Sequence, residues 1–302
     1  MLDYITEEYS CQVNRLFQKM AIKKNDNKKV IKWLEGIGDV QRAEHIKDCA
    51  QYIGITNVDG IAKIAKADFC RERLCAVCAW RRQSKFLAQM FPVISILSDK
   101  YRFLFATLTI KNMPYDELEA AVNTLLSGYE KLRHRRKIKR SWLGMVRSIE
   151  LTYNEKDKEF HPHIHLLIAV DKSYFNDTEK YISQNELSLL WSNCIQADYV
   201  PICDIRAVNN NVVATVETLK YSLKPTKADE AFKAFYYVLK GRRLISFSGV
   251  FAETRNELQL SDFENVLTDD DVKAKTRRVF CELYQFDVTG GVYRFYKSME
   301  MI

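Results

Sequence analysis

Apolar and polar positions divide the middle of the chain into strands and helices. Strand patterns, either β-branched apolar runs or polar-apolar alternation, lie at 103–110, 144–153, 162–170 and 199–207. Helical spacing lies near 115–139, 211–224 and 228–240, and a capping box at Ser183 and Glu186 opens a further helix. The order of the first six elements is β-α-β-β-α-β. This order predicts an α+β protein with a ferredoxin-like antiparallel sheet covered by helices on one face.

The two ends of the chain have patterns of their own. Residues 1–48 show helical spacing, with candidate core residues at Val30, Ile31, Trp33 and Leu34. Near the other end, apolar runs flank Thr289–Gly291 in the manner of a β-hairpin. We therefore expect three parts: an N-terminal helical and cysteine-containing module over 1–95, a central domain over 96–250, and a C-terminal extension with a hairpin over 251–302.

Three of the five histidines alternate along one predicted strand, at His161, His163 and His165. Alternate strand residues share a face, and neutral imidazoles on one face can bind a divalent cation. If the preceding hairpin folds about its midpoint, Glu150 lies opposite His163, although a slip of one residue would turn it to the other face. Glu150, His163 and His165 would then bind one ion, and this mixed ligand set suits Mn²⁺ or Mg²⁺. His161 is the alternative residue to complete the site.

The predicted helix at 211–224 carries a second, polar face beside its apolar stripe. Glu217, Tyr221 and Lys224 lie one turn apart on that face. A phenol can attack a phosphodiester, a carboxylate can act as a base or activate water, and an ammonium can stabilise phosphate charge. Taken alone, such a face is typical of a solvated helix surface. Together with the histidine strand, it predicts a catalytic site.

Four of the eight cysteines have the spacing of a zinc site. Cys70, Cys75 and Cys78 form C-x4-C-x2-C, and Cys49 precedes them by 21 residues. Four thiolates in a reducing compartment indicate a closed, structural Zn²⁺ site. His45, four residues before Cys49, is an alternative fourth ligand. The remaining cysteines are interpreted as free thiols, at Cys11, Cys194, Cys203 and Cys281.

The net charge of +7 favours a polyanionic partner. Seven Lys or Arg residues occupy the ten positions from Lys131 to Arg140, at the end of a predicted helix. A solvated basic face is the ordinary alternative, but we favour contact with the DNA phosphate backbone. The residues expected to make it are Arg133, Arg135, Arg136, Lys137, Lys139 and Arg140.

The sequence has neither an apolar run of 18 residues nor the basic and apolar regions of a signal peptide at its start. We therefore expect a cytoplasmic protein that does not bind a membrane. Thiols stay reduced in that compartment, which agrees with the zinc interpretation of the cysteine cluster.

Together these motifs resemble those of rolling-circle plasmid replication initiators of the His-hydrophobic-His (HUH) endonuclease superfamily. The match rests on the first motif strand Phe103–Thr109, the metal strand HPHIHLLIAV and the tyrosine motif ETLKYSLKPT. The cysteine block FCRERLCAVCAWRR is also similar to the region ahead of the nuclease core in one branch, although Ala76 stands where Pro is common. The resemblance extends from about Cys49 to about Gly249.

In that branch a single catalytic Tyr follows a Glu by one turn, and Tyr221 and Glu217 match this pattern. The resemblance implies a metal-dependent enzyme that nicks and joins single-stranded DNA at a specific site. The intermediate would be a 5′-phosphotyrosine at Tyr221, and Glu217 would assist hydrolysis at termination. The implied substrate is plasmid origin DNA, single-stranded or in an extruded hairpin, and the implied partners are a host helicase and polymerase.

Two other functions fit parts of the pattern. An HUH transposase or conjugative relaxase would use the same chemistry on different DNA, but the cysteine block and the single Tyr after a Glu argue against it. A catalytically inactive, zinc-containing DNA-binding regulator is the other candidate. The presence of Tyr221, His163 and His165 argues against loss of catalysis.

Overall fold

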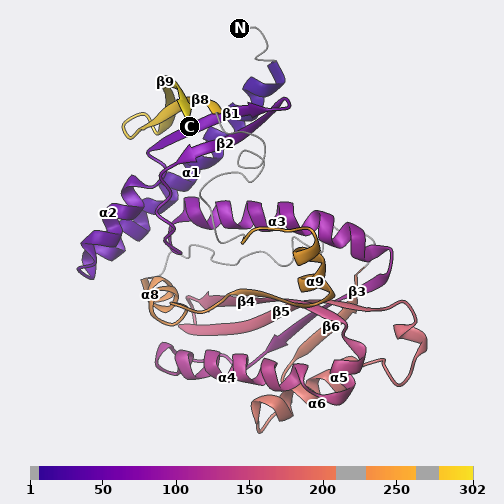
Figure 1. The fold of residues 1–302 in the computed structure, drawn as a ribbon. Coiled ribbons are helices and arrows are strands. Elements are labelled where there is room, and N and C mark those ends of the chain that lie inside the picture. Colours follow the sequence, from indigo (N-terminus) through magenta and orange to yellow (C-terminus); the bar gives the residue numbers. More distant parts are fainter. Residues whose placement is uncertain (1–6, 209–228, 263–278, 302) are drawn as a thin grey trace. The chain divides into compact units, whose positions relative to one another are not determined.

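The computed structural model describes residues 7–208, 229–262 and 279–301 (Figure 1). The chain divides into two compact units, one made of Met1–Lys85 and Ser261–Ile302 and the other of Phe86–Leu260. Whether residues 1–95, 96–250 and 251–302 fold as three separate domains is not tested by this division, and that organisation stays a prediction.

The Phe86–Leu260 unit is built on a five-stranded antiparallel sheet (Figure 1). Its strands, in spatial order, are β6 (Cys203–Ala207), β3 (Tyr101–Thr109), β5 (Glu159–Asp171), β4 (Gly144–Asn154) and β7 (Ile245–Gly249). The first and third strands of the β-α-β-β-α-β path, β3 and β5, lie side by side in the centre, as in a ferredoxin-like fold. The predicted α+β class is therefore confirmed. Strand β7 extends the sheet beyond the predicted set.

Helices α4 (Tyr115–Arg133) and α6 (Gln184–Ile195) pack together and cover one face of this sheet (Figure 1). A Cβ atom at Gly128 of α4 would lie 2.5 Å from a methyl carbon of Ile195, so glycine permits this close approach. The predicted helix over 115–139 is interrupted at His134, and a short helix α5 (Arg136–Ser141) follows. A continuous helix would place like charges four residues apart through this basic segment, which is unfavourable.

Other predicted boundaries agree closely with the structure. The side chain of Ser183 accepts a hydrogen bond from the backbone N–H of Glu186, which confirms the N-cap of α6. The last core strand begins at Cys203 and not near 199, because Pro201 has no N–H to donate to a neighbouring strand. The unit also contains the short 3-10 helix η1 (Tyr174–Asn176) and helix α8 (Asp229–Tyr237).

The opposite face of the sheet carries helix α9 (Val250–Glu257) and residues 86–98 of helix α3 (Ala76–Ser98). The ring of Phe247 in β7 lies 6.2 Å from that of Phe86, and Phe103 in β3 lies 6.0 Å from Phe251. Helices therefore cover part of this face as well, and they come from segments outside the β-α-β-β-α-β core.

The other unit contains helices α1 (Glu7–Gly36) and α2 (Val40–Asp48) and a four-stranded antiparallel sheet. The strands, in spatial order, are β2 (Ile61–Ala67), β1 (Tyr52–Val58), β8 (Val279–Asp287) and β9 (Val292–Met301). Strands β8 and β9 confirm the predicted hairpin, whereas β1 and β2 were not predicted. Val30 and Leu34 are buried as expected, but Ile31 and Trp33 are only partly buried. Within the described residues, no helix is both long and apolar enough to cross a bilayer.

Candidate metal sites

Three side chains of the central strands β4 and β5 converge on one face of the five-stranded sheet. Glu150 is directly opposite His163 in the antiparallel register, as predicted, and His165 is the next residue on the same face. The Oε2 atom of Glu150 lies 2.9 Å from Nε2 of His163 and 2.7 Å from Nε2 of His165. One possible ligand atom from each of the three residues lies within 4.8 Å of the others.

This cluster lies on the face opposite α4 and α6. The hydroxyl of Tyr129 in α4 contacts the sulfur of Met145, so the odd-numbered residues of β4 face that helix. Glu150 therefore points to the other side of the sheet. The side chains of Glu150, His163 and His165 are at most 15% exposed, so water is largely excluded from the contacts between them.

The second nitrogen of each imidazole has a partner of its own. Nδ1 of His163 lies 3.1 Å from the backbone oxygen of His161, and because this oxygen can only accept, Nδ1 carries a proton. Nδ1 of His165 lies 3.1 Å from the hydroxyl of Thr107, the residue opposite it on β3. Contacts of this kind fix ring orientation and are typical of metal-binding histidines. Both rings therefore present Nε2 to Glu150.

The contact between Glu150 and His163 needs a proton or a metal ion between the two facing atoms. With its proton on Nδ1, a neutral His163 presents a lone pair at Nε2 to a carboxylate oxygen only 2.9 Å away. A proton on the ring or on the carboxyl group, or a metal ion, removes this repulsion. Two ligands at about 2.1 Å from an octahedral ion, in neighbouring positions, lie about 3 Å apart. The observed spacing and the donor atoms thus fit a divalent cation such as Mg²⁺ or Mn²⁺.

His161 lies beside this cluster but is not part of it. Its ring centroid is 5.1 Å from that of His163. Burial, and to a smaller extent the neighbouring His163, lowers the pKa of His161 below its usual value, which favours the neutral ring. A role for His161 as an additional ligand stays a prediction.

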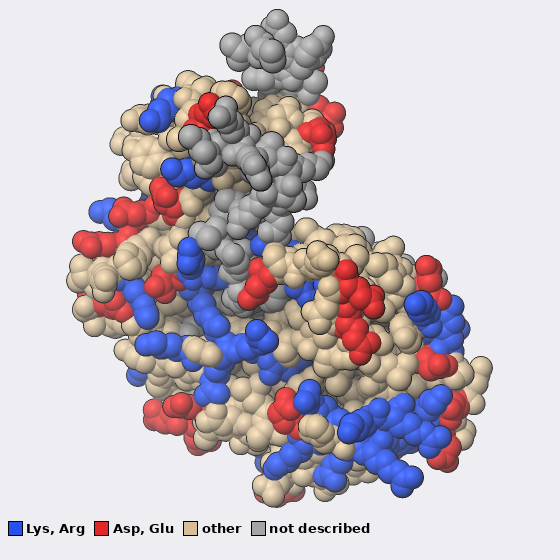
Figure 2. All heavy atoms as spheres, viewed as in Figure 1, with Lys and Arg blue, Asp and Glu red and all other residues tan. Residues whose placement is uncertain are grey.

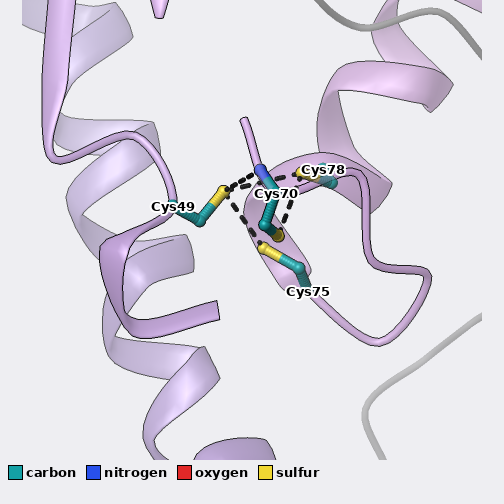
Figure 3. Close-up of side chains that lie close together, drawn as sticks. All are labelled: Cys49, Cys70, Cys75 and Cys78. Carbon is teal, nitrogen blue, oxygen red and sulfur yellow. Dashed lines mark hydrogen bonds between the residues drawn. The ribbon is translucent and has the colours of Figure 1, made fainter. Parts of the chain in front are cut away.

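The four cysteines predicted to bind zinc lie together in the other unit (Figure 3). The sulfur atom of Cys49 lies 3.5 Å from those of Cys75 and Cys78, and the sulfur atoms of Cys70 and Cys78 are 3.7 Å apart. Four sulfurs arranged tetrahedrally at about 2.3 Å from zinc would be about 3.8 Å apart. All four cysteines are free thiols, and the cluster fits a structural zinc site. His45 is exposed and does not belong to this group.

Two buried polar residues of α1, which the sequence reasoning missed, complete this cluster. The side-chain amide of Asn27 donates to the sulfur of Cys75 at 3.3 Å and accepts from the backbone N–H of Ala76 at 2.7 Å. Nζ of Lys24 donates to the backbone oxygen of Cys49 at 2.7 Å. Burial lowers the pKa of Lys24, while nearby cysteines, Cys49 first, act in the opposite direction. Both residues continue the helical spacing of the buried positions of α1, so polar residues at core positions were the available signal.

The predicted DNA-binding residues lie at the end of α4 and along α5, where Figure 2 shows many Lys and Arg side chains gathered. Some of these cations are paired with carboxylates. Both carboxylate oxygens of Glu186 lie 2.8 Å from Nζ of Lys137, so this lysine connects α5 to α6. Ion pairs also join Arg133 to Glu130 and Arg140 to Glu179. The exposed members of the group are Arg135, Arg136, Lys139 and Arg140.

The predicted catalytic residues of the tyrosine motif, Glu217, Tyr221 and Lys224, lie outside the described residues. The structure therefore describes the metal-binding candidates Glu150, His163 and His165 but not the residues of the tyrosine motif. The catalytic roles of Glu217, Tyr221 and Lys224 stay predictions.

Comparisons with known proteins place the chain in a family. A family model described as a replication protein matches residues 61–294. A relative named Protein rep from Streptococcus pneumoniae is 37% identical over 247 residues, which cover 77% of each chain. Relatives of the same name from Lactiplantibacillus plantarum and Lentilactobacillus hilgardii are each 32% identical. The first of these two matches covers 80% of this chain and 86% of the relative, and the second covers 89% and 92%.

No solved structure matches the chain significantly. The family model spans well over half of the sequence and takes in both the cysteine cluster and the histidine strand, apart from Cys49. The chain therefore belongs to the replication-protein family of plasmid Rep initiators that its motifs resemble.

Proposed function

We propose that this protein starts rolling-circle replication by nicking, and later rejoining, one strand of plasmid origin DNA with the help of a divalent metal ion. The observation that carries the proposal is the convergence of Glu150, His163 and His165, whose spacing and donor atoms fit a divalent cation. Membership of the replication-protein family supports origin DNA as the substrate.

The described residues have distinct parts in this proposal. Glu150, His163 and His165 would hold Mn²⁺ or Mg²⁺, which would polarise the scissile phosphate when bound. The backbone oxygen of His161 and the hydroxyl of Thr107 keep both imidazoles turned with Nε2 toward Glu150. The carboxylate of Glu150 contributes the negative charge that distinguishes this site from an uncharged pair of imidazoles.

The nucleophile is proposed from the resemblance of the tyrosine motif. The phenolic oxygen of Tyr221 would attack the scissile phosphorus after losing its proton to a base. The bond from phosphorus to the 3′ oxygen would break, which leaves a 5′-phosphotyrosine and a free 3′-OH for polymerase. Lys224 would stabilise phosphate charge, and Glu217 would promote attack by water at termination. A host helicase would open the duplex ahead of the new strand.

The remaining candidate residues have supporting parts. The cysteine cluster would hold a structural Zn²⁺, and a cytoplasmic location would keep its thiols reduced. Arg133, Arg135, Arg136, Lys139 and Arg140 would contact the phosphate backbone of origin DNA. Lys137 contributes less, because its charge is already paired with Glu186.

The test uses a single-stranded oligonucleotide that carries the nick site of the plasmid origin. Wild-type protein should cleave it with Mn²⁺ and form a covalent adduct visible on a denaturing gel. His163→Ala should lose cleavage, because its Nε2 is a proposed metal ligand. His134→Ala, which replaces an exposed histidine at the end of α4, is the matched control and should cleave normally.

Two further variants separate the residues of the tyrosine motif. Tyr221→Phe should form no adduct, whereas Glu217→Ala should still nick but accumulate plasmid multimers. Cleavage by wild-type protein in EDTA, with zinc content unchanged, would contradict the role of the divalent ion. An adduct on a tyrosine other than Tyr221, located by mass spectrometry, would refute the proposed nucleophile.

A further inference from the structure

A chain of ring contacts leads from the metal-site residues to the edge of the five-stranded sheet. The ring of Phe105 in β3 lies 5.3 Å from that of His165, with the two planes 25° apart. The guanidinium of Arg206 in β6 lies 5.4 Å from the centre of the Phe105 ring. Phe105 is paired directly with Arg206 in the register, and β6 is the outermost strand on this side. Arg206, Phe105 and His165 therefore touch in sequence along one face.

Arg206 is exposed enough to contact a ligand, whereas Phe105 is not. The Phe105 side chain is buried, with 6% of its surface exposed, so its ring cannot stack on a nucleobase. The Arg206 side chain is 64% exposed. Its ion pair within the described residues, to Asp204 at 3.7 Å, involves Nε and lies in solvent, where such pairs contribute little stability. The guanidinium thus remains available for a stronger anionic partner.

We propose that Arg206 binds a backbone phosphate of the single DNA strand, about one or two nucleotides from the scissile phosphate. This inference rests on the proposed function. The two ring contacts place the guanidinium within about 11 Å of the His165 ring, on the same face of the sheet. A guanidinium pairs with two phosphate oxygens at once, which gives strength and direction to the contact. The Phe105 ring restrains the arginine beforehand, so that less conformational freedom is lost on binding.

The contact would align the strand with the metal site. A phosphate held at Arg206 fixes the path of the DNA on one side of His165, and the metal ligands fix the scissile phosphate on the other. Two fixed points set the register of the strand, which one point cannot do. Arg206 is therefore a positioning residue for the proposed reaction.

The experiment measures binding of a fluorescent oligonucleotide that carries the nick site, by anisotropy at several salt concentrations. Arg206→Ala should weaken binding about tenfold and reduce the slope of log Kd against log salt by about 0.7, the value for one phosphate contact on a single strand. Arg206→Lys should keep most of the salt slope but recover only part of the affinity, because an ammonium lacks the paired geometry.

Arg102→Ala is the matched control. Arg102 is also exposed and lies over an aromatic ring, that of Phe175 at 5.7 Å, but it points to the other face of the sheet. This variant should bind the oligonucleotide with wild-type affinity and salt slope. Circular dichroism of all three variants checks that the fold is retained.

Oligonucleotides with single neutral methylphosphonates locate the contact. Neutralising a phosphate one or two nucleotides from the nick should weaken binding by wild-type protein and cause no further loss in Arg206→Ala. The proposal would be overturned if the methylphosphonate weakened binding by Arg206→Ala as much as it weakens binding by wild-type protein. An Arg206→Ala variant with an unchanged salt slope would also overturn it. Binding without nicking by wild-type protein would count against the proposed chemistry, and the methylphosphonate scan would still decide the role of Arg206.

Discussion

Replacing Trp191 with phenylalanine should destabilise the Phe86–Leu260 unit by a predictable amount. Trp191 lies in α6, is fully buried, and donates its indole N–H to the backbone oxygen of Thr109 at 2.7 Å. Thr109 is the last residue of β3 and pairs with His163, so this hydrogen bond connects the helical layer to the strand end beside the metal site. Phenylalanine keeps an aromatic ring but has no N–H.

The expected cost has two parts of similar size. The oxygen of Thr109 loses its indole donor, which costs about 1 kcal/mol. The smaller ring also leaves a cavity of about 40 Å³, and at about 24 cal/mol per Å³ this adds about 1 kcal/mol. A total of about 2 kcal/mol should lower the Tm of a unit of this size by about 4 to 8 °C.

Differential scanning calorimetry is the appropriate assay, because it records a separate transition for each unit that unfolds separately. Leu189→Ala, at an exposed position of the same helix, is the control and should change stability by no more than about 0.5 kcal/mol. A Tm for Trp191→Phe within 1 °C of wild type, a limit of about 0.3 kcal/mol, would refute the reasoning.

Two other predictions concern the cysteines. Purified protein should contain about one Zn²⁺ per chain, and Lys24→Met should release it about tenfold faster to a chromogenic chelator, because the buried ammonium that offsets the thiolate charge is lost. Lys28→Met, at an exposed position one turn further along α1, is the control, and equal release rates in the two variants would count against this role. Burial raises the pKa of Cys203 to about 11, so at pH 8 only about one thiol in a thousand is ionised there. Iodoacetamide at pH 8 should therefore modify the exposed Cys11 and spare Cys203 in intact protein, and mass spectrometry that finds equal labelling would show that Cys203 is accessible in solution.

The candidate sites were predictable where they depend on local pattern. Glu150 and His163 belong to one hairpin, so the position of its turn fixes which residues are opposite. The cysteine cluster was likewise predicted from the spacing of Cys70, Cys75 and Cys78, which are close in sequence. Within the hairpin and within Cys70–Cys78 few residues separate the partners, and the geometry of one turn or loop determines the contact.

The remaining contacts depend on packing between distant segments, which spacing does not encode. Lys24 reaches the cysteine cluster only because α1 packs beside it, and Arg206 meets Phe105 only through the pairing of β6 with β3. Strand β7 is five residues long and pairs with β4 about a hundred residues earlier in the chain. Its short sequence lacks the length from which a pattern could be recognised.

The pairing of β1 with β8 has a consequence for synthesis of the protein. Ile53 is opposite Tyr284, and the hydroxyl of Tyr293 donates to the backbone oxygen of Ala50, next to the zinc ligand Cys49. The Phe86–Leu260 unit is inserted between these segments, so a ribosome completes the whole of that unit before the partner strand of β1 emerges. During this interval β1 has an unpaired edge, which is prone to aggregation. A nascent or prematurely terminated chain can thus contain every residue of the histidine site and still lack the strands that enclose its cysteine module.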